Sequence, residues 1–97
     1  MKLRFTRRAA EDLLQIADYI REHDAHAALG VRAAILESLR ILTDFPLIGR
    51  RQTIEGVRKL TTRRYPYAVY YLIDERTDEV VVLAVLHPAQ ARPYDDR

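Results

Sequence analysis

Two amphipathic helical patterns, separated by a short polar break, limit the possible folds of this chain more than any other feature. In the first, Arg7 to Glu22, apolar side chains recur at helical spacing, and Thr6 can cap the first turn. The second pattern follows Asp24, a good N-cap, and ends near Thr43 because Pro46 disfavours helical geometry in the residue before it. A connection this short makes the two helices antiparallel neighbours.

Segments with strand character precede and follow the two helices. Lys2 to Phe5 alternates polar and apolar residues and is long enough for one edge strand. Val57 to Thr62 and Tyr67 to Asp74 are rich in β-branched and aromatic residues, which favour strands. Pro46 to Gly56 has no periodicity and is predicted to be a surface loop. Glu79 to Leu86 is an almost unbroken apolar run, typical of a central strand covered on both faces.

The order of these segments predicts an α+β fold of the type β-α-α-β-β-β. An N-terminal edge strand leads into an antiparallel two-helix hairpin, which packs on one side of a mostly antiparallel sheet. The chain has 97 residues, enough for one core only, so residues 1–97 are expected to form a single domain.

Composition argues against several kinds of site. The chain has no cysteine, which removes disulfides and thiolate metal sites, and its only histidines, His23, His26 and His87, lack ligand spacing. It also lacks a Gly-rich phosphate loop and a nucleophile elbow. We therefore expect no metal and no cofactor. Because no long apolar stretch or signal-peptide pattern occurs, the sequence predicts a cytoplasmic protein that does not enter the membrane.

Positive charge is concentrated between Arg50 and Arg64. Residues 1–44 hold seven Lys/Arg and seven Asp/Glu, whereas residues 50–64 hold six Lys/Arg and a single acid, Glu55. Such a patch can attract an anionic partner, either nucleic acid or an acidic peptide, although arginines on a solvated strand pair also serve solubility. The candidate partner-binding residues are Arg50, Arg51, Arg58, Lys59, Arg63, Arg64 and Arg92.

The same part of the chain carries side chains suited to metal-independent RNA cleavage. Cleavage by the 2′-hydroxyl needs a base, an acid and positive charge near the phosphorane, which His, Tyr, Lys and Arg can supply. The candidate catalytic residues for such an RNase are Arg58, Lys59, Arg64, His87, Arg92 and Tyr94. Binding of an acidic partner by the arginines is the alternative. Tyr67 and Tyr71, at alternate strand positions, can equally pack in the core beneath the hairpin.

Four short fragments, spread over nearly the whole chain, carry a family resemblance. They are Ala9-x-x-Asp12-Leu13-x-x-Ile16-x-x-Tyr19, Phe45-Pro46-x-x-Gly49-Arg50, Tyr67-x-Val69-x-Tyr71, and Val85-Leu86-His87 followed by Arg92. In this order, and with the predicted element order, they resemble the ParE/RelE superfamily of type II toxin-antitoxin toxins.

The resemblance implies one of two activities. ParE-like members inhibit DNA gyrase and are linked to plasmid stabilization, whereas RelE-like members are ribosome-dependent endoribonucleases that cut mRNA. RelE-like members usually carry basic residues at the start of the third strand and after the last strand, where this chain has Ala68 and Ala89. Because alanine cannot stabilise a pentavalent phosphate, the resemblance favours the ParE-like branch. A RelE-like RNase is the alternative, and a toxin retained only as a binding module is a third possibility.

The resemblance also implies a cognate antitoxin that holds the toxin inactive in a hetero-oligomer. The antitoxin's acidic or amphipathic C-terminal segment orders on binding, so it needs concentrated charge and an apolar groove to offset its lost conformational entropy. We expect the cations between Arg50 and Arg64 to supply the charge and the outer groove of the helical hairpin to supply the apolar surface.

Overall fold

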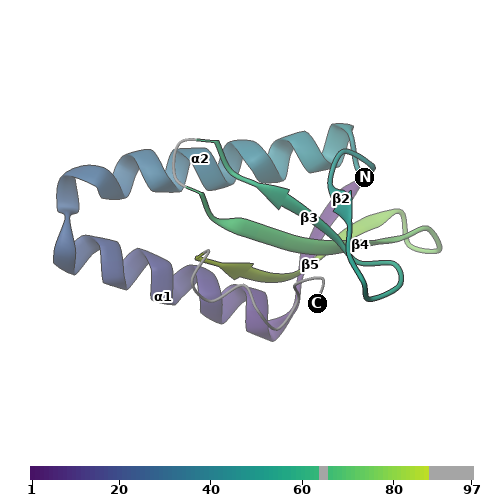
Figure 1. Ribbon diagram of the computed structural model, residues 1–97, viewed down its shortest axis with the longest axis horizontal. Coiled ribbons are helices and arrows are strands. Elements are labelled where there is room, and N and C mark those ends of the chain that lie inside the picture. The colour runs from purple at the N-terminus through teal and green to yellow at the C-terminus, as the bar shows by residue number, and fades with distance from the viewer. Residues whose placement is uncertain (64–65, 88–97) are drawn as a thin grey trace.

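The computed structural model describes residues 1–63 and 66–87, and it places two helices on one face of a five-stranded sheet (Figure 1). The elements are β1 (Lys2–Phe5), α1 (Arg7–His23), α2 (Ala25–Asp44), β2 (Arg50–Arg51), β3 (Arg58–Thr61), β4 (Ala68–Asp74) and β5 (Glu79–Leu86). The predicted α+β fold and its antiparallel helical hairpin are confirmed. No helix in the described part of the chain is both long and apolar enough to span a bilayer.

The sheet has the order β1-β5-β4-β3-β2, with β1 and β2 at its edges. β1 pairs with β5 in parallel, and the other three pairings are antiparallel. The N-terminal segment is thus an edge strand, as predicted. The expectation of a loop throughout Pro46 to Gly56 was wrong, because β2 forms inside it against β3. A strand of two residues has no periodicity to detect, since only its neighbour defines it.

Side-chain capping fixes the start of each helix of the hairpin. The Thr6 hydroxyl accepts a hydrogen bond from the Ala9 amide at 3.1 Å and so caps α1. The Asp24 carboxylate accepts from the Ala27 amide at 3.1 Å and caps α2. Asp24 alone connects the two helices, which turns them back on each other and places both against the sheet.

A bulge in β5 changes which residues of its apolar run face the helices. Tyr70 is paired with Ala84 and Tyr71 with Val82, so Leu83 has no direct partner on β4. Before the bulge, alternate residues such as Val82 pack against the helices, and after it the alternation shifts by one residue. The other face of the sheet carries a second buried cluster formed by Val57, Ala68, Tyr70, Ala84 and Leu86.

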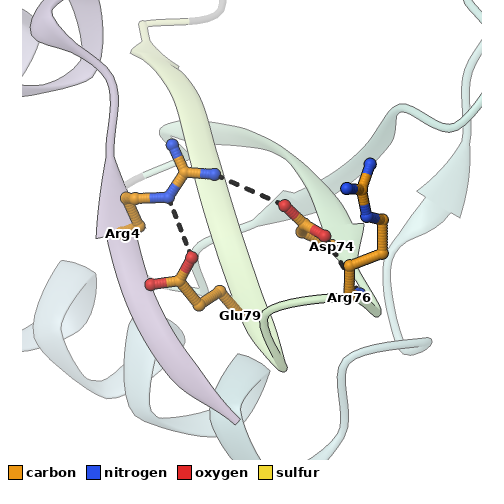
Figure 2. Close-up of polar contacts among 4 residues, drawn as sticks. All are labelled: Arg4, Asp74, Arg76 and Glu79. Carbon is orange, nitrogen blue, oxygen red and sulfur yellow. Dashed lines mark hydrogen bonds and ion pairs between the residues drawn. The ribbon is translucent and has the colours of Figure 1, made fainter.

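An ion-pair cluster joins β1 to the β4–β5 hairpin. The Arg4 guanidinium lies between two carboxylates, with Nε 3.0 Å from Glu79 Oε1 and Nη2 3.6 Å from Asp74 Oδ2 (Figure 2). The Arg76 amide donates to Asp74 Oδ1 at 3.1 Å, which orients that carboxylate. Hydrogen bonds from the Thr77 side chain and from Arg4 lower the pKa of Glu79. One arginine therefore ties the N-terminal strand to two others.

Candidate functional site

Four of the predicted partner-binding cations form a two-step ladder at the β2 edge of the sheet. Arg50 lies opposite Lys59, and Arg51 lies opposite Arg58. Like charges placed directly across a strand pair repel one another, so this ladder does not stabilise the edge by itself. The predicted Arg63 is also exposed, in the bend after β3. Arg64, Arg92 and Tyr94 lie outside the described residues.

Strand alternation divides the ladder between the two faces of the sheet. Arg58 pairs with Tyr71, which packs in the core beneath the helices, so it shares the helical face. Lys59 pairs with Tyr70, which belongs to the cluster on the other face, and its Nζ lies 6.0 Å from the centre of the Tyr70 ring. The cations that are adjacent in sequence therefore do not make one site.

The Arg58 side chain donates to backbone carbonyls of the loop between α2 and β2. Its Nη1 donates to the carbonyls of Leu47 at 3.1 Å and Gly49 at 2.8 Å, in the connection between α2 and β2. Its cross-strand partner Tyr71 contacts the same loop, where the Tyr71 hydroxyl donates to the Pro46 carbonyl at 2.7 Å and accepts from the Gly49 amide at 2.9 Å. Two side chains from neighbouring strands thus hold the Phe45–Gly49 loop in one conformation.

The close approach of Tyr71 explains the glycine in this loop. A Cβ at Gly49 would lie 2.5 Å from the Tyr71 hydroxyl oxygen and 2.7 Å from Cε1, closer than real side chains approach. The fragment Phe45-Pro46-x-x-Gly49-Arg50 and the later Tyr71 are therefore parts of one structural unit.

Both core tyrosines are held in the neutral form. Burial raises the pKa of Tyr71, and hydrogen bonding from Gly49 together with the charge of Arg58 offsets only part of that rise. Burial, and then Tyr19, raise the pKa of Tyr67. Neither phenol can serve as a general base near neutral pH. The core alternative for Tyr67 and Tyr71 is thus the one that the structure adopts.

The described candidates for RNA cleavage do not converge. The His87 ring makes an edge contact with Tyr67, with the ring centres 5.7 Å apart, whereas Arg58 is level with Tyr71. Tyr67 and Tyr71 are four residues apart in an extended chain, which separates their Cα atoms by about 13 Å at 3.3 Å per residue. Lys59 faces the other side of the sheet, and Ala68 is buried within β4. No single phosphate can contact Arg58, Lys59 and His87 together.

A cavity between α1 and the end of β5 was not predicted from the sequence. It has a volume of about 570 Å³ and is lined by polar and aromatic side chains, including Arg8, Asp12, Tyr19, Tyr67 and His87. Asp12 has a structural role there, because its Oδ2 accepts a hydrogen bond from the Val85 amide at 3.0 Å where β1 no longer covers β5. The sequence did contain a signal for this role, because Asp12 is an acidic residue between Ala9 and Ile16 on an otherwise apolar helix face.

The helical hairpin carries an apolar groove of about 410 Å³. Both helices line it, from Leu13 to Arg21 on α1 and from Ala28 to Leu39 on α2. Leu29 is 76% exposed and Leu36 50% exposed, so the groove leaves large apolar side chains open to solvent.

Comparison with known proteins decides the family. The family described as "ParE toxin of type II toxin-antitoxin system, parDE" has a model that matches residues 3–92. The chain belongs to the ParE toxin family. As a relative, "Putative toxin Y4kP" of Sinorhizobium fredii is 34% identical over 92 residues, covering 95% of this chain and 93% of that protein. The protein is therefore a type II toxin of the ParE/RelE superfamily, as the sequence fragments predicted.

Solved structures place the toxin's fold in the same superfamily. A chain from the chromosomal ParDE system of P. aeruginosa has a TM-score of 0.78 and 29% identity, with 90% of this chain and 95% of that one covered. A chain of RelBE2 from Mycobacterium tuberculosis has a TM-score of 0.55 and 29% identity, with coverages of 89% and 95%. A chain of the E. coli RelBE complex has a TM-score of 0.64 and 20% identity, with 88% of this chain and 93% of that one covered, and shows a likeness of fold alone.

Proposed function

We propose that this toxin arrests growth in the cytoplasm by binding and inhibiting DNA gyrase, and that a cognate antitoxin neutralises it. The observation that carries the proposal is the dispersal of Arg58, Lys59 and His87, which leaves the described residues without an assembled acid–base site for RNA cleavage. A toxin without such a site can still act by occupying a protein target. The match to the ParE toxin family over residues 3–92 also supports a ParE-like mode of action.

The antitoxin part of the proposal is supported by the surface of the helical hairpin. Its groove offers apolar area to an amphipathic segment, and the arginines of β2 offer charge to an acidic one. A segment that folds on binding loses conformational entropy and needs both contributions. The similar chains include members of a ParDE system and a RelBE toxin-antitoxin complex.

Truncation tests the antitoxin part. Removing the C-terminal segment of the antitoxin should abolish its complex with the toxin, whereas removing its N-terminal DNA-binding part should leave the complex intact. A complex that survives the C-terminal truncation unchanged contradicts this part of the proposal.

Expression in cells without the antitoxin tests the target. The expected result is growth arrest in which reporter plasmids lose negative supercoiling while primer extension shows intact transcripts. Cuts in translated mRNA with normal plasmid topology would instead support the RelE-like alternative, in which Arg64, Arg92 and Tyr94 complete the site. Absence of any growth arrest would indicate a protein kept only as a binding module.

A further inference from the structure

We propose that the Phe45–Gly49 loop, with the β2 arginines beside it, is the surface with which the toxin docks onto its protein target, at an apolar recess rimmed by carboxylates. This inference rests on the proposed function in one respect, namely that growth arrest comes from binding a protein. It does not depend on that protein being gyrase.

The loop exposes large apolar side chains. Phe45 is 63% exposed, Leu47 66% and Ile48 52%, and Ile54 nearby is 49% exposed. Single exposed apolar residues are ordinary, but three in a loop of five residues concentrate exposed apolar area in one segment. Because more than half of each of these residues is open to solvent, their side chains extend into solvent, and we call this loop the apolar projection.

The backbone of this projection is held rigidly. Tyr71 is fully buried, yet its hydroxyl is used for the Pro46 carbonyl and the Gly49 amide. Arg58 binds two further carbonyls of the loop, and the Ile48 amide donates to the Phe45 carbonyl at 3.1 Å. A loop fixed before binding loses little entropy when it docks, so its apolar side chains can contribute most of their burial to affinity.

Charge beside the loop indicates the chemistry of the partner. Arg50 and Arg51 follow Gly49 directly and flank the loop from the two faces of the sheet, since Arg51 lies opposite Arg58 and Arg50 opposite Lys59. Both are exposed and have no ion-pair partner among residues 1–63 and 66–87. Arginines at the rim of an apolar contact pair well with carboxylates and speed association. A nucleic acid would complement the arginines but not the apolar projection, so an acidic protein surface fits both parts.

The shape of the loop favours a folded target over the antitoxin segment. An unfolded segment gains most from a concave groove, and the groove of the hairpin runs between α1 and α2 from near their junction to Leu39. The connection from α2 to β2 lies at the opposite end of the molecule from that junction (Figure 1). None of the residues that line the groove comes from the loop. The two partners thus use different apolar surfaces, a concave one for the antitoxin and a projection for the target, and share the β2 arginines.

A matched pair of leucines tests the proposal. Leu47→Ser removes an apolar side chain from the loop, and Leu14→Ser removes one from α1 that is equally exposed, at 66%, and lies outside both cavities. Both variants should fold, which thermal melts check. We expect Leu47→Ser, and more so Leu47→Ser/Ile48→Ser, to weaken growth arrest and target inhibition about tenfold or more while antitoxin affinity stays within about twofold. Leu14→Ser should change none of these.

Two further measurements distinguish failure of the gyrase proposal from failure of the docking proposal. If the wild type arrests growth without affecting supercoiling, gyrase is the wrong target, and the growth arrest caused by the loop variants alone then decides the docking proposal. Full growth arrest by Leu47→Ser/Ile48→Ser overturns it. Loss of arrest in Arg50→Ala/Arg51→Ala with full arrest by the leucine variant also overturns it, in favour of a nucleic acid partner. A wild type that does not arrest growth overturns both proposals.

Discussion

The hydroxyl of Tyr71 accepts a hydrogen bond from the amide of Gly49 at 2.9 Å, across 22 residues of sequence. This contact joins the middle of the sheet to the loop that we assign to target docking. Arg58, an arginine of the basic region, supports the same loop by donating to two of its carbonyls. Arg58 and Tyr71, whose side chains are suited to binding or catalysis, therefore hold the Phe45–Gly49 loop in its conformation.

Gly49→Ala should destabilise the toxin by about 1–3 kcal/mol, because the new Cβ meets the Tyr71 ring and hydroxyl. Urea unfolding measures the loss. Gly56→Ala is the control, since Gly56 has open space around it and only a positive φ of 82° to be strained. A Tyr71→Phe background removes the nearer clash and should reduce the cost at Gly49 alone. Equal costs in both backgrounds would show that Tyr71 does not set the glycine requirement.

Stability should fall at alkaline pH through Tyr71. Its folded pKa is raised above the ordinary 10.0, so its neutral form contributes stability below pH 10.0, and this contribution is lost as pH rises through the folded value. Denaturant unfolding at several pH values from neutral upward measures the slope. Tyr71→Phe should have the shallower decline above pH 10.0, with the other ionisable groups common to both proteins. Identical slopes would contradict the burial of a neutral phenol.

Asp12→Ala should cost about 1–3 kcal/mol, because it leaves the Val85 amide at the end of β5 without its acceptor. Asp18→Ala is the matched control on the same helix, since its carboxylate is 68% exposed and, within residues 1–63 and 66–87, forms an ion pair only with Arg21. Hydrogen exchange provides a second readout, as the Val85 amide should lose protection in the first variant and keep it in the second. Unchanged protection in Asp12→Ala would refute the assigned role.

Acid should loosen β1 through Glu79. The pKa of Glu79 lies below its ordinary 4.5, so its stabilising effect is complete above that value and is lost as pH falls through the folded value. Glu79→Gln should be less stable than the wild type near neutral pH and should converge with it in acid. NMR titration of the Glu79 carboxylate checks the direction of the shift, and an ordinary or raised pKa would be inconsistent with the Arg4 and Thr77 contacts.

Local sequence signals were sufficient for most of the fold. Thr6 and Asp24 were identifiable as caps because capping depends on side chains within one turn. The apolar run from Glu79 to Leu86 gave the bounds of β5 as the structure has them. The bulge at Leu83 was not predictable, because it depends on the register with β4 and not on the run itself.

The candidate site was less predictable because its properties depend on contacts between distant residues. A count of charges between Arg50 and Arg64 cannot show that alternate strand residues face opposite sides of the sheet. It also cannot show that Arg58 binds the carbonyls of Leu47 and Gly49, since the same side chain could equally have faced solvent.

Supercoiling of relaxed plasmid by purified gyrase, titrated with purified toxin, tests the central claim most directly. Our account predicts that the wild type inhibits supercoiling, that an equimolar amount of antitoxin restores it, and that His87→Ala inhibits as well as the wild type, because no acid–base chemistry is involved. Supercoiling that continues unchanged at saturating toxin, together with cleavage of mRNA on translating ribosomes, would contradict it.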